Sequence, residues 1–127
     1  MATVELTKGN FEQVITDSPM VIVDFWAPWC GPCRGFAPIY EQAAVSHADV
    51  VFGKINTDQE QELAGAFSIR SIPTLMVFRE KVVLFQQAGA LPASALEQVI
   101  TQAKTLDMAK VHQEIAARDA QSGQAPS

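Results

Sequence analysis

The pair Cys30 and Cys33 is the part of this chain whose residue types and spacing most directly suggest a reaction. The pair follows an almost continuously apolar stretch, residues 20–27, and precedes a stretch in which apolar residues recur with helical spacing. A Cys-x-x-Cys pair between a strand and a helix is typical of a redox dithiol. Two thiols one helical turn apart can close a disulfide with little movement of the backbone. The spacing therefore predicts a reversible disulfide.

The position of Cys30 at the start of the expected helix favours its thiolate form. There the sulfur meets unsatisfied backbone N–H groups and the positive end of the helix dipole. Both effects lower the pKa of a thiol toward neutrality and so produce an effective nucleophile. Cys33 lies one turn further into the helix, where this field is weaker. We predict that Cys30 is exposed and attacks a substrate disulfide, and that Cys33 resolves the mixed disulfide.

Asp24 is the only charged residue between Pro19 and Cys33, and it interrupts the apolar stretch. Burial of an ionised carboxylate is costly, and a raised pKa is the usual outcome. The alternation of a strand places Asp24 on the same face as Ile22 and Trp26. A purely structural aspartate, capped by hydrogen bonds, is the alternative.

A structural zinc site is the competing interpretation of the two cysteines. Such a site needs four ligands, and only His47 and His112 remain as imidazole ligands, both far along the chain. We therefore expect no metal.

Composition and charge exclude several classes of protein. The chain has 127 residues, 48% hydrophobic and 18% charged, which suits one globular domain. The net charge is −5 and the nine Lys and Arg residues are scattered, so nucleic acid is not an expected partner. No signal-peptide pattern and no apolar run of membrane-spanning length occurs, so we expect no membrane association and a cytoplasmic location. A disulfide there would be transient.

Hydrophobic patterning predicts the elements that position the cysteines. Strands are expected at residues 3–6, 20–27, 50–56, 74–79 and 82–88, and helices at about 10–16, 30–47, 59–67 and after residue 92. Asn10 and Gln13 resemble a capping box. The connection Glu80-Lys81 lacks the Asn-Gly or Asp-Gly of a tight hairpin turn, so we expect a looser one. Pattern alone supports an α/β or α+β protein with a mixed sheet.

The pentapeptide Trp29-Cys30-Gly31-Pro32-Cys33 resembles the active-site motif of the thioredoxin family. The resemblance covers about residues 4–104 and implies the α/β thioredoxin fold, a mixed central β-sheet flanked by helices on both faces. We expect a thioredoxin domain over residues 1–104 and a C-terminal extension over 105–127. In the extension Met108, Val111 and Ile115 continue a helical period, and residues 121–127 are expected to be a disordered tail.

The resemblance also implies roles for residues outside the cysteine pair. Asp24 would be the buried acid that exchanges a proton with the resolving thiol, with Lys54 beside it. Pro73, after Ile72, would be the family's cis-proline opposite the cysteines, where the backbone of Ile72 meets an extended substrate. The expected substrate-binding residues around the sulfur are Trp29, Gly31, Pro32, Ile72, Pro73, Gly89 and Ala90.

By the same resemblance the protein reduces protein disulfides, since Gly31-Pro32 is similar to the dipeptide of the reducing members. We expect a monomer without bound cofactor that receives electrons from NADPH through thioredoxin reductase. Expected clients are ribonucleotide reductase, peroxiredoxin and methionine sulfoxide reductase. Two alternatives remain: an interaction module that uses its C-terminal extension to bind a partner, and a thiol oxidant or isomerase.

Overall fold

A five-stranded mixed sheet forms the centre of the protein in a computed structural model that describes residues 2–121. Its strands are β1 (Thr3–Glu5), β2 (Met20–Trp26), β3 (Val51–Asn56), β4 (Thr74–Arg79) and β5 (Val82–Ala88). The order across the sheet is β1-β3-β2-β4-β5. The strands β1, β3 and β2 are parallel, while β4 is antiparallel to β2 and to β5. The mixed sheet and the antiparallel hairpin predicted from the sequence are confirmed.

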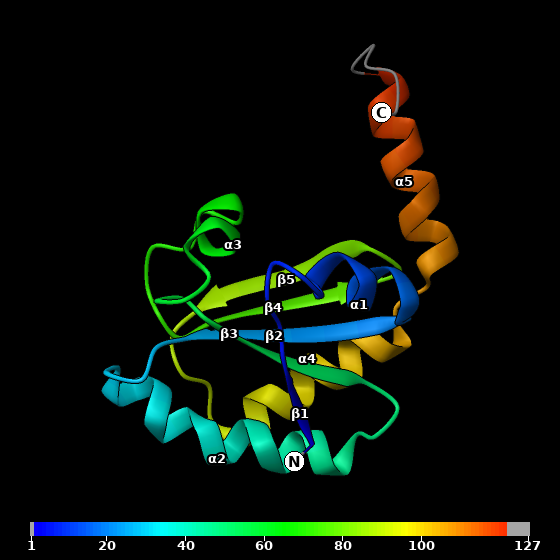
Figure 1. The fold of residues 1–127 in the computed structure, drawn as a ribbon. Helices are drawn as coiled ribbons and strands as arrows, with labels where there is room; N and C mark the ends of the chain where they lie inside the picture. The colour runs from blue at the N-terminus through cyan, green and yellow to red at the C-terminus, as the bar shows by residue number, and fades with distance from the viewer. Residues whose placement is uncertain (1, 122–127) are drawn as a thin grey trace.

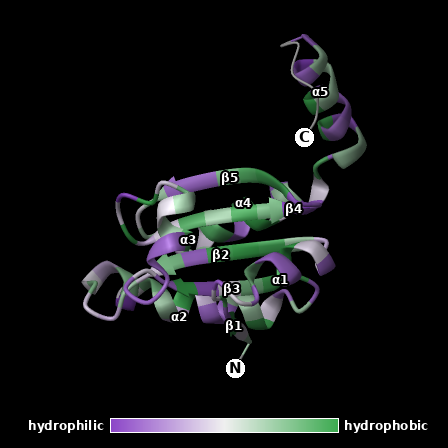
Figure 2. Cartoon of the chain, turned by 45° about the horizontal axis from the view of Figure 1, so that its top comes forward, coloured by the Kyte–Doolittle hydropathy of each residue, from purple (hydrophilic) through white to green (hydrophobic). Residues whose placement is uncertain are grey.

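Helices cover both faces of this sheet. The helices α2 (Gly31–Ser46) and α4 (Ala93–Thr105) lie on one face, and α1 (Phe11–Asp17) and α3 (Gln61–Ala66) lie on the other (Figure 1). The alternation of β2 serves both layers: Ile22 packs in the core under α2 and α4, and Val21 and Val23 pack in the core under α1 and α3. Figure 2 shows hydrophobic residues along β2 and β4 in the middle of the sheet. Burial on both faces explains why β2 is almost continuously apolar.

Tyr40 on α2, the helix that begins at the cysteines, makes hydrogen bonds to the sheet. Its side chain is fully buried, and its hydroxyl lies 3.0 Å from the Ile22 carbonyl oxygen and 2.7 Å from that of Gly53. A phenol buried with a hydrogen-bond partner avoids the cost of an unpaired polar group. Because the two acceptors belong to β2 and β3, this contact fixes α2 across both strands.

The predicted capping box at the start of α1 is wrong. Asn10 precedes the helix, but its side chain makes no hydrogen bond to the helix N-terminus. Its Oδ1 accepts from the backbone N–H of Thr7 at 2.8 Å, and its Nδ2 donates to the Glu5 carbonyl at 3.0 Å. The asparagine side chain thus stabilises the turn after β1, as Asn often does in turns.

The turn between β4 and β5 is tight, contrary to the expectation of a looser one. Arg79 pairs with Val82, so only Glu80 and Lys81 connect the strands. Both have positive φ, 51° and 68°, as in a type I′ turn. That turn matches the right-handed twist of a hairpin. The geometry of the sheet has therefore imposed a left-handed backbone on two residues that do not favour it.

Replacing Lys81 by Gly should stabilise the protein, because glycine adopts positive φ without the clash of a Cβ atom. We expect the free energy of unfolding to rise by about 0.5–1 kcal/mol, measured by urea denaturation. Lys81→Ala is the matched control, since it removes the same side chain but keeps Cβ. An equal gain in both variants would show that the side chain, and not the backbone conformation, is responsible.

The C-terminal extension contains a separate helix, α5 (Met108–Gln121), and not a continuation of α4. Leu106 is extended, with ψ of 137°, and Asp107 accepts a hydrogen bond from the Lys110 N–H at 3.2 Å. The Arg79 guanidinium donates to the carbonyls of Ala103 and Leu106 at 2.8 and 2.7 Å. These contacts satisfy groups that the end of a helix leaves unpaired, and they stabilise the break between the helices.

From this break α5 projects away from the body of the protein (Figure 1). Its first residue, Met108, is buried, whereas most of the helix is exposed. Of the predicted tail, Gln121 is the last residue of α5, and 122–127 lie outside the described residues. Over residues 2–121, no helix combines the length and the hydropathy needed to cross a membrane.

Candidate redox site

The two cysteines form a disulfide at the junction of β2 and α2. Their Cα atoms are 5.2 Å apart, and Cys30 is the residue that caps the N-terminus of α2. The backbone N–H of Cys33 donates to Cys30 Sγ at 3.2 Å, and Pro32 lies in the first turn. A proline suits this turn because its missing N–H would have no partner there. The predicted strand, dithiol and helix arrangement is confirmed.

The prediction that Cys30 is exposed is wrong for this disulfide form. Cys30 is only 4% exposed and Cys33 only 2%. Cys30 Sγ lies 3.7 Å from the carbonyl oxygen of Ile72, and the disulfide packs with Ala27, Trp26 and Ile72. The loop before β4 therefore covers the sulfur, which the local sequence around the cysteines could not show.

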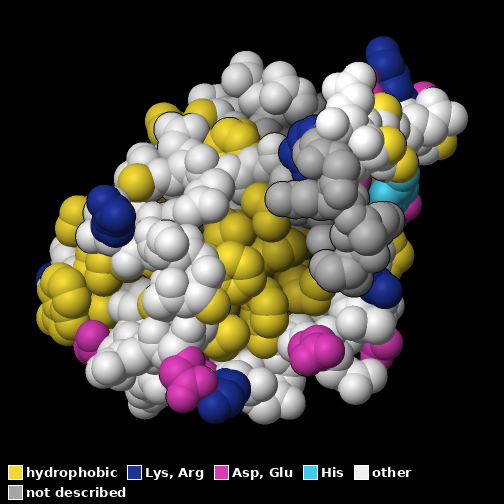
Figure 3. Space-filling view, turned by 90° about the horizontal axis from the view of Figure 1, so that it is seen from above, with side chains coloured by type: hydrophobic (Ala, Val, Ile, Leu, Met, Phe, Trp, Pro, Cys, Tyr) yellow, Lys and Arg dark blue, Asp and Glu magenta, His cyan; other side chains and the backbone are white. Residues whose placement is uncertain are grey.

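The expected substrate-binding residues beside the disulfide form an apolar surface, which we call the rim: Trp29, Gly31, Pro32, Ile72, Pro73, Gly89 and Ala90. Figure 3 shows hydrophobic side chains at the end of the molecule where β2 passes into α2, at the left of that view. Trp29 is 68% exposed, and its Nε1–H donates to the Asp58 carboxylate at 3.0 Å. Sequence reasoning assigned no role to Asp58; its position just after β3, beside the end of β2, was the available signal. Gly31 and Pro32 are also exposed.

The loops before β4 and after β5 meet beside the disulfide. The Ile72-Pro73 peptide bond is cis, which confirms the prediction, and Pro73 is buried. The N–H of Gly89 donates to the Pro73 carbonyl at 2.7 Å, and Gly89 has a φ of 102° that favours glycine. Ile72 is half-buried, and Gly89 and Ala90 are exposed. Of the expected substrate-binding residues that are distant from Cys30 in the sequence, Ile72 contacts its sulfur through the backbone carbonyl.

Asp24 is buried in β2 without a hydrogen-bond partner. It is 1% exposed, and neither carboxylate oxygen has a partner within the described residues. Burial raises the pKa of Asp24 to about 7, and the nearby charge of Lys54 opposes that rise. The hydrogen bonds that the structural alternative expected to cap Asp24 are therefore not found among residues 2–121. A carboxyl with this pKa can both accept and release a proton at neutral pH.

Lys54 lies next to Asp24 on the neighbouring strand, since the two residues are in register between β2 and β3. The Lys54 ammonium lies 4.5 Å from the centroid of the Trp26 ring, a cation–π contact. Trp26 is half-buried and packs against the cluster that Ala27 and the two cysteines form. The Trp26 side chain thus contacts both Lys54 and the cluster that contains the disulfide. Core packing alone would explain a tryptophan at this position.

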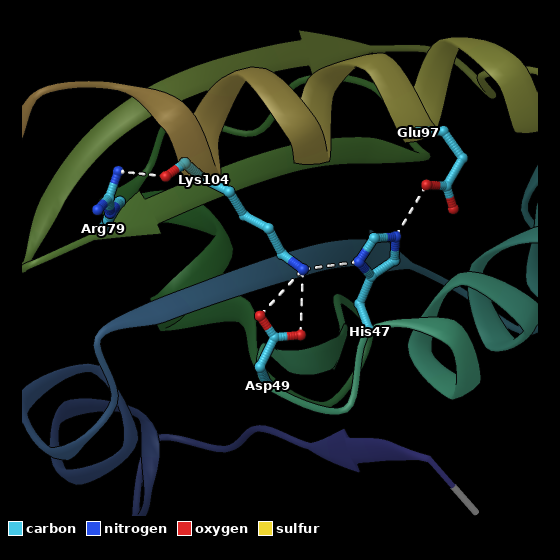
Figure 4. A network of polar contacts seen from close by, with 5 residues as sticks. All are labelled: His47, Asp49, Arg79, Glu97 and Lys104. Carbon is cyan, nitrogen blue, oxygen red and sulfur yellow. Dashed lines mark hydrogen bonds and ion pairs between the residues drawn. The ribbon is translucent and has the colours of Figure 1, made fainter.

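Both histidines take part in contacts between helices or between a helix and a turn. His47 Nε2 lies 2.8 Å from Glu97 Oε2, and its Nδ1 lies 2.8 Å from the Lys104 ammonium (Figure 4). Because an ammonium only donates, Nδ1 is the acceptor and Nε2 carries the hydrogen. His112 Nε2 contacts Glu80 at 3.0 Å. Among residues 2–121, no three His, Cys, Asp or Glu side chains come together in a way that could hold a metal ion.

Comparison with known proteins gives a consistent result over most of the chain. The family model described as Thioredoxin matches residues 2–102. The putative thioredoxin 2 of Streptomyces coelicolor is 56% identical over 122 residues, which cover 96% of this chain and 91% of the relative. A thioredoxin of Alicyclobacillus acidocaldarius is 46% identical over 97 residues, covering 76% of this chain and 92% of the relative.

Solved structures agree. The structure of a mutant thioredoxin from Halobacterium salinarum has a TM-score of 0.76 at 30% identity, and the similarity covers 83% of this chain and 93% of the other. Plasmodium falciparum thioredoxin has a TM-score of 0.72 at 35% identity, covering 77% and 96% of the two chains.

Proposed function

Because this chain belongs to the thioredoxin family, it is a thiol–disulfide oxidoreductase that reduces protein disulfides, and we propose that Cys30 attacks and Cys33 resolves. The observation that carries this assignment is the disulfide at the N-terminus of α2, with Cys30 as the capping residue. In the dithiol form, Cys30 at this position receives the field of the helix N-terminus, which favours a thiolate. Cys33 lies within the first turn of α2, where this field is weaker.

The proposed reaction moves two electrons from the dithiol to a substrate disulfide. The Cys30 thiolate attacks one substrate sulfur, which forms a mixed disulfide and releases the other substrate sulfur as a thiolate that takes up a proton. The Cys33 thiol then loses its proton and attacks Cys30 Sγ, which releases the second substrate thiolate. The substrate is reduced to a dithiol, and Cys30 and Cys33 are oxidised to the disulfide seen in the structure.

Asp24 is the proposed acceptor of the Cys33 proton, and Lys54 is the proposed modulator of that acceptor. The pKa of about 7, which burial produces, allows Asp24 to be ionised before the transfer and protonated after it. The Lys54 charge favours the ionised form. The absence of any hydrogen-bond partner for Asp24 within residues 2–121 supports a role beyond structure.

The rim is the proposed substrate-binding surface, formed by Trp29, Gly31, Pro32, Ile72, Pro73, Gly89 and Ala90. Contact of the Ile72 carbonyl with Cys30 supports this, because an extended substrate that pairs with this backbone would have its sulfur beside Cys30. Main-chain pairing tolerates many side chains, which suits disulfide-containing proteins of varied sequence.

We also propose the context in which the protein acts. It is a monomeric electron carrier of the cytoplasm, and NADPH supplies its electrons through thioredoxin reductase. Its clients are disulfide-containing proteins such as ribonucleotide reductase, peroxiredoxin and methionine sulfoxide reductase. Residues 1–104 are the catalytic domain, and 105–127 are an extension, a division supported by the break between α4 and α5.

A coupled assay tests this proposal. The protein, a thioredoxin reductase and a disulfide-bonded protein such as insulin are mixed with NADPH, and NADPH oxidation is followed by absorbance. We expect oxidation that depends on all three components and is lost in the Cys30→Ser variant. A reduction potential well above that of cytosolic reductants, together with no NADPH oxidation, would instead support a thiol oxidant or isomerase.

A further inference from the structure

Lys54 lies in a row of charged residues that crosses three strands. In the registers of the sheet, its Cα partner on β1 is Glu5 and its partner on β2 is Asp24. Residues in register on neighbouring parallel strands point to the same face. Lys54 therefore has a carboxylate residue on each side, on the face of the sheet that α2 covers. Glu5 is exposed and Asp24 is buried.

The Lys54 ammonium forms an ion pair with neither of them. Within the part of the chain that the structure describes, no carboxylate lies at ion-pair distance from Lys54, and the ammonium instead lies over the Trp26 ring, 4.5 Å from its centroid. Lys54 also borders a groove of about 570 Å³ beneath the cysteine-bearing helix. The groove is lined by Thr3, Glu5, Trp26, Ala37, Pro38, Glu41 and Lys54.

Glu41 contributes a fixed negative charge to this groove. It is half-buried on α2, and its carboxylate accepts hydrogen bonds from the Ala2 N–H at 2.9 Å and from the Thr3 hydroxyl at 3.0 Å. The hydrogen bond from Ala2, more than the charge of Lys54, lowers the pKa of Glu41. The carboxylate is therefore ionised throughout the neutral range and held in place by two donors.

We propose that Glu41 is a positioning residue of the redox reaction, which draws the Lys54 ammonium toward the groove, against the Trp26 ring, and so limits how strongly Lys54 acts on Asp24. This role rests on the proposed function, in which Asp24 takes the proton of Cys33. The charge of Lys54 is shared between a fixed surface anion and the buried acid.

Few charged or titratable groups besides Lys54 face Asp24 and could change how easily it ionises. On β3 the register partner of Asp24 is Lys54, whose own partner on β1 is Glu5. On β4 the register partner of Asp24 is the apolar Leu75. From α2 it meets Tyr40, whose pKa is raised by burial and by the Asp24 charge, so the phenol is neutral. Cys33 is its partner in the reaction. Glu41 is the fixed anion that shares the groove with Lys54.

Removal of the Glu41 charge should therefore favour ionisation of Asp24. In Glu41→Gln the amide oxygen still accepts from the Ala2 N–H, and the amide NH2 can donate to the Thr3 hydroxyl in place of the lost acceptor. With the negative charge removed, Lys54 is free to interact more strongly with Asp24. We expect the Asp24 titration midpoint to fall by about 0.5 pH unit, measured by carboxyl carbon NMR on the intact oxidised protein. The pH profile of mixed-disulfide resolution should shift in the same direction.

Two controls separate this mechanism from its rivals. Glu114→Gln removes the same charge from the exposed surface of α5 and should leave the midpoint unchanged. In a Lys54→Met background, Glu41→Gln should shift the midpoint by less than half as much, because the coupling runs through Lys54. An unchanged or higher midpoint in Glu41→Gln, an equal shift in Glu114→Gln, or a full shift in the Lys54→Met background would each overturn the proposal.

The NMR measurement also distinguishes failure of this inference from failure of the proposed function. It follows Asp24 in the oxidised protein, where no thiol reacts. If the midpoint shifts as expected while the pH profile of resolution does not move, Glu41 tunes Asp24 but Asp24 does not take the Cys33 proton. If the midpoint does not shift, the Glu41 assignment is wrong whatever the kinetics show.

Discussion

Cys33→Ser should convert the protein into a trap that holds its substrates covalently through Cys30. The first attack needs only the Cys30 thiolate, whereas release of the substrate needs a second thiol held within bonding reach. An intramolecular thiol has a very high effective concentration, so its loss should lower turnover by more than about 1,000-fold. Mass spectrometry of the trapped complex after proteolysis will identify the bond.

The matched variant is Cys30→Ser, which keeps Cys33 but removes the residue at the helix N-terminus. Cys33 lies inside the first turn of α2 and is not the N-cap residue, so its thiolate is less favoured and this variant should trap little or no substrate. A complex that forms through Cys33 with similar yield would reverse the two roles. Circular dichroism of both variants verifies that the fold is retained.

Asp24→Asn should slow resolution of the mixed disulfide at neutral pH. The amide cannot accept the Cys33 proton, and general acid–base catalysis of this kind contributes roughly 100-fold. Stopped-flow measurement of the resolution step from pH 6 to 9 will show the effect. In the unchanged protein the rate should rise with pH around the Asp24 pKa of about 7, because the ionised form is the base. Unchanged kinetics in the variant across this range would remove Asp24 from the mechanism.

The same substitution should stabilise the protein, and the gain should depend on pH. Burial raises the pKa of Asp24 from 3.8 to about 7, so folding opposes ionisation of this group. Below the unfolded pKa, Asp24 is protonated in both states and does not oppose folding. As pH rises toward the folded pKa, only the unfolded chain ionises, so the folded state loses stability relative to the unfolded state. The difference corresponds to about 4 kcal/mol above pH 7. Because burial of the Asn amide offsets part of this, we expect a gain of about 2–4 kcal/mol at pH 8.

Chemical denaturation of both proteins at pH 8 and pH 3 tests the sign as well as the size. At pH 3 the carboxyl is protonated in the folded and in the unfolded chain, so the pH-dependent gain should vanish. Asp17→Asn, at an exposed carboxylate at the end of α1, is the control and should show no such pH dependence. Equal stability of Asp24→Asn and the unchanged protein at pH 8 would contradict the placement of an ionisable group in the core.

Predictions that depended on local pattern agree with the structure. The apolar run that became β2, the Cys30 and Cys33 spacing at a helix N-terminus, and the hairpin of β4 and β5 are visible along a single stretch of chain. The buried Asp24 belongs to this group, because a single acid inside an otherwise apolar strand is carried into the core with its neighbours. The cis peptide before Pro73 came from the family resemblance, since cis bonds are a minority before proline.

Predictions that depended on distant contacts were incomplete or wrong. The turn at Glu80 and Lys81 is tight because the strands on either side are held in the sheet, which overrides the residue preferences of the turn. The helix after residue 92 ends where Arg79, from β4, contacts its last carbonyls. The side chain of Asn10 was available for a cap, but the turn before it offered a free N–H.

Sequence alone was sufficient for the main chemical groups of this protein: two thiols one helical turn apart, a strand that leads into them and an acid buried in that strand. The environment of these groups came only with folding. The Ile72 carbonyl covers Cys30, Asp58 contacts Trp29, and Lys54 lies over Trp26 in register with Glu5 and Asp24. Each of these contacts or pairings joins segments that are far apart in the chain. Periodicity reports which face of its own element a residue occupies, whereas strand register and helix packing decide which other segment that face meets.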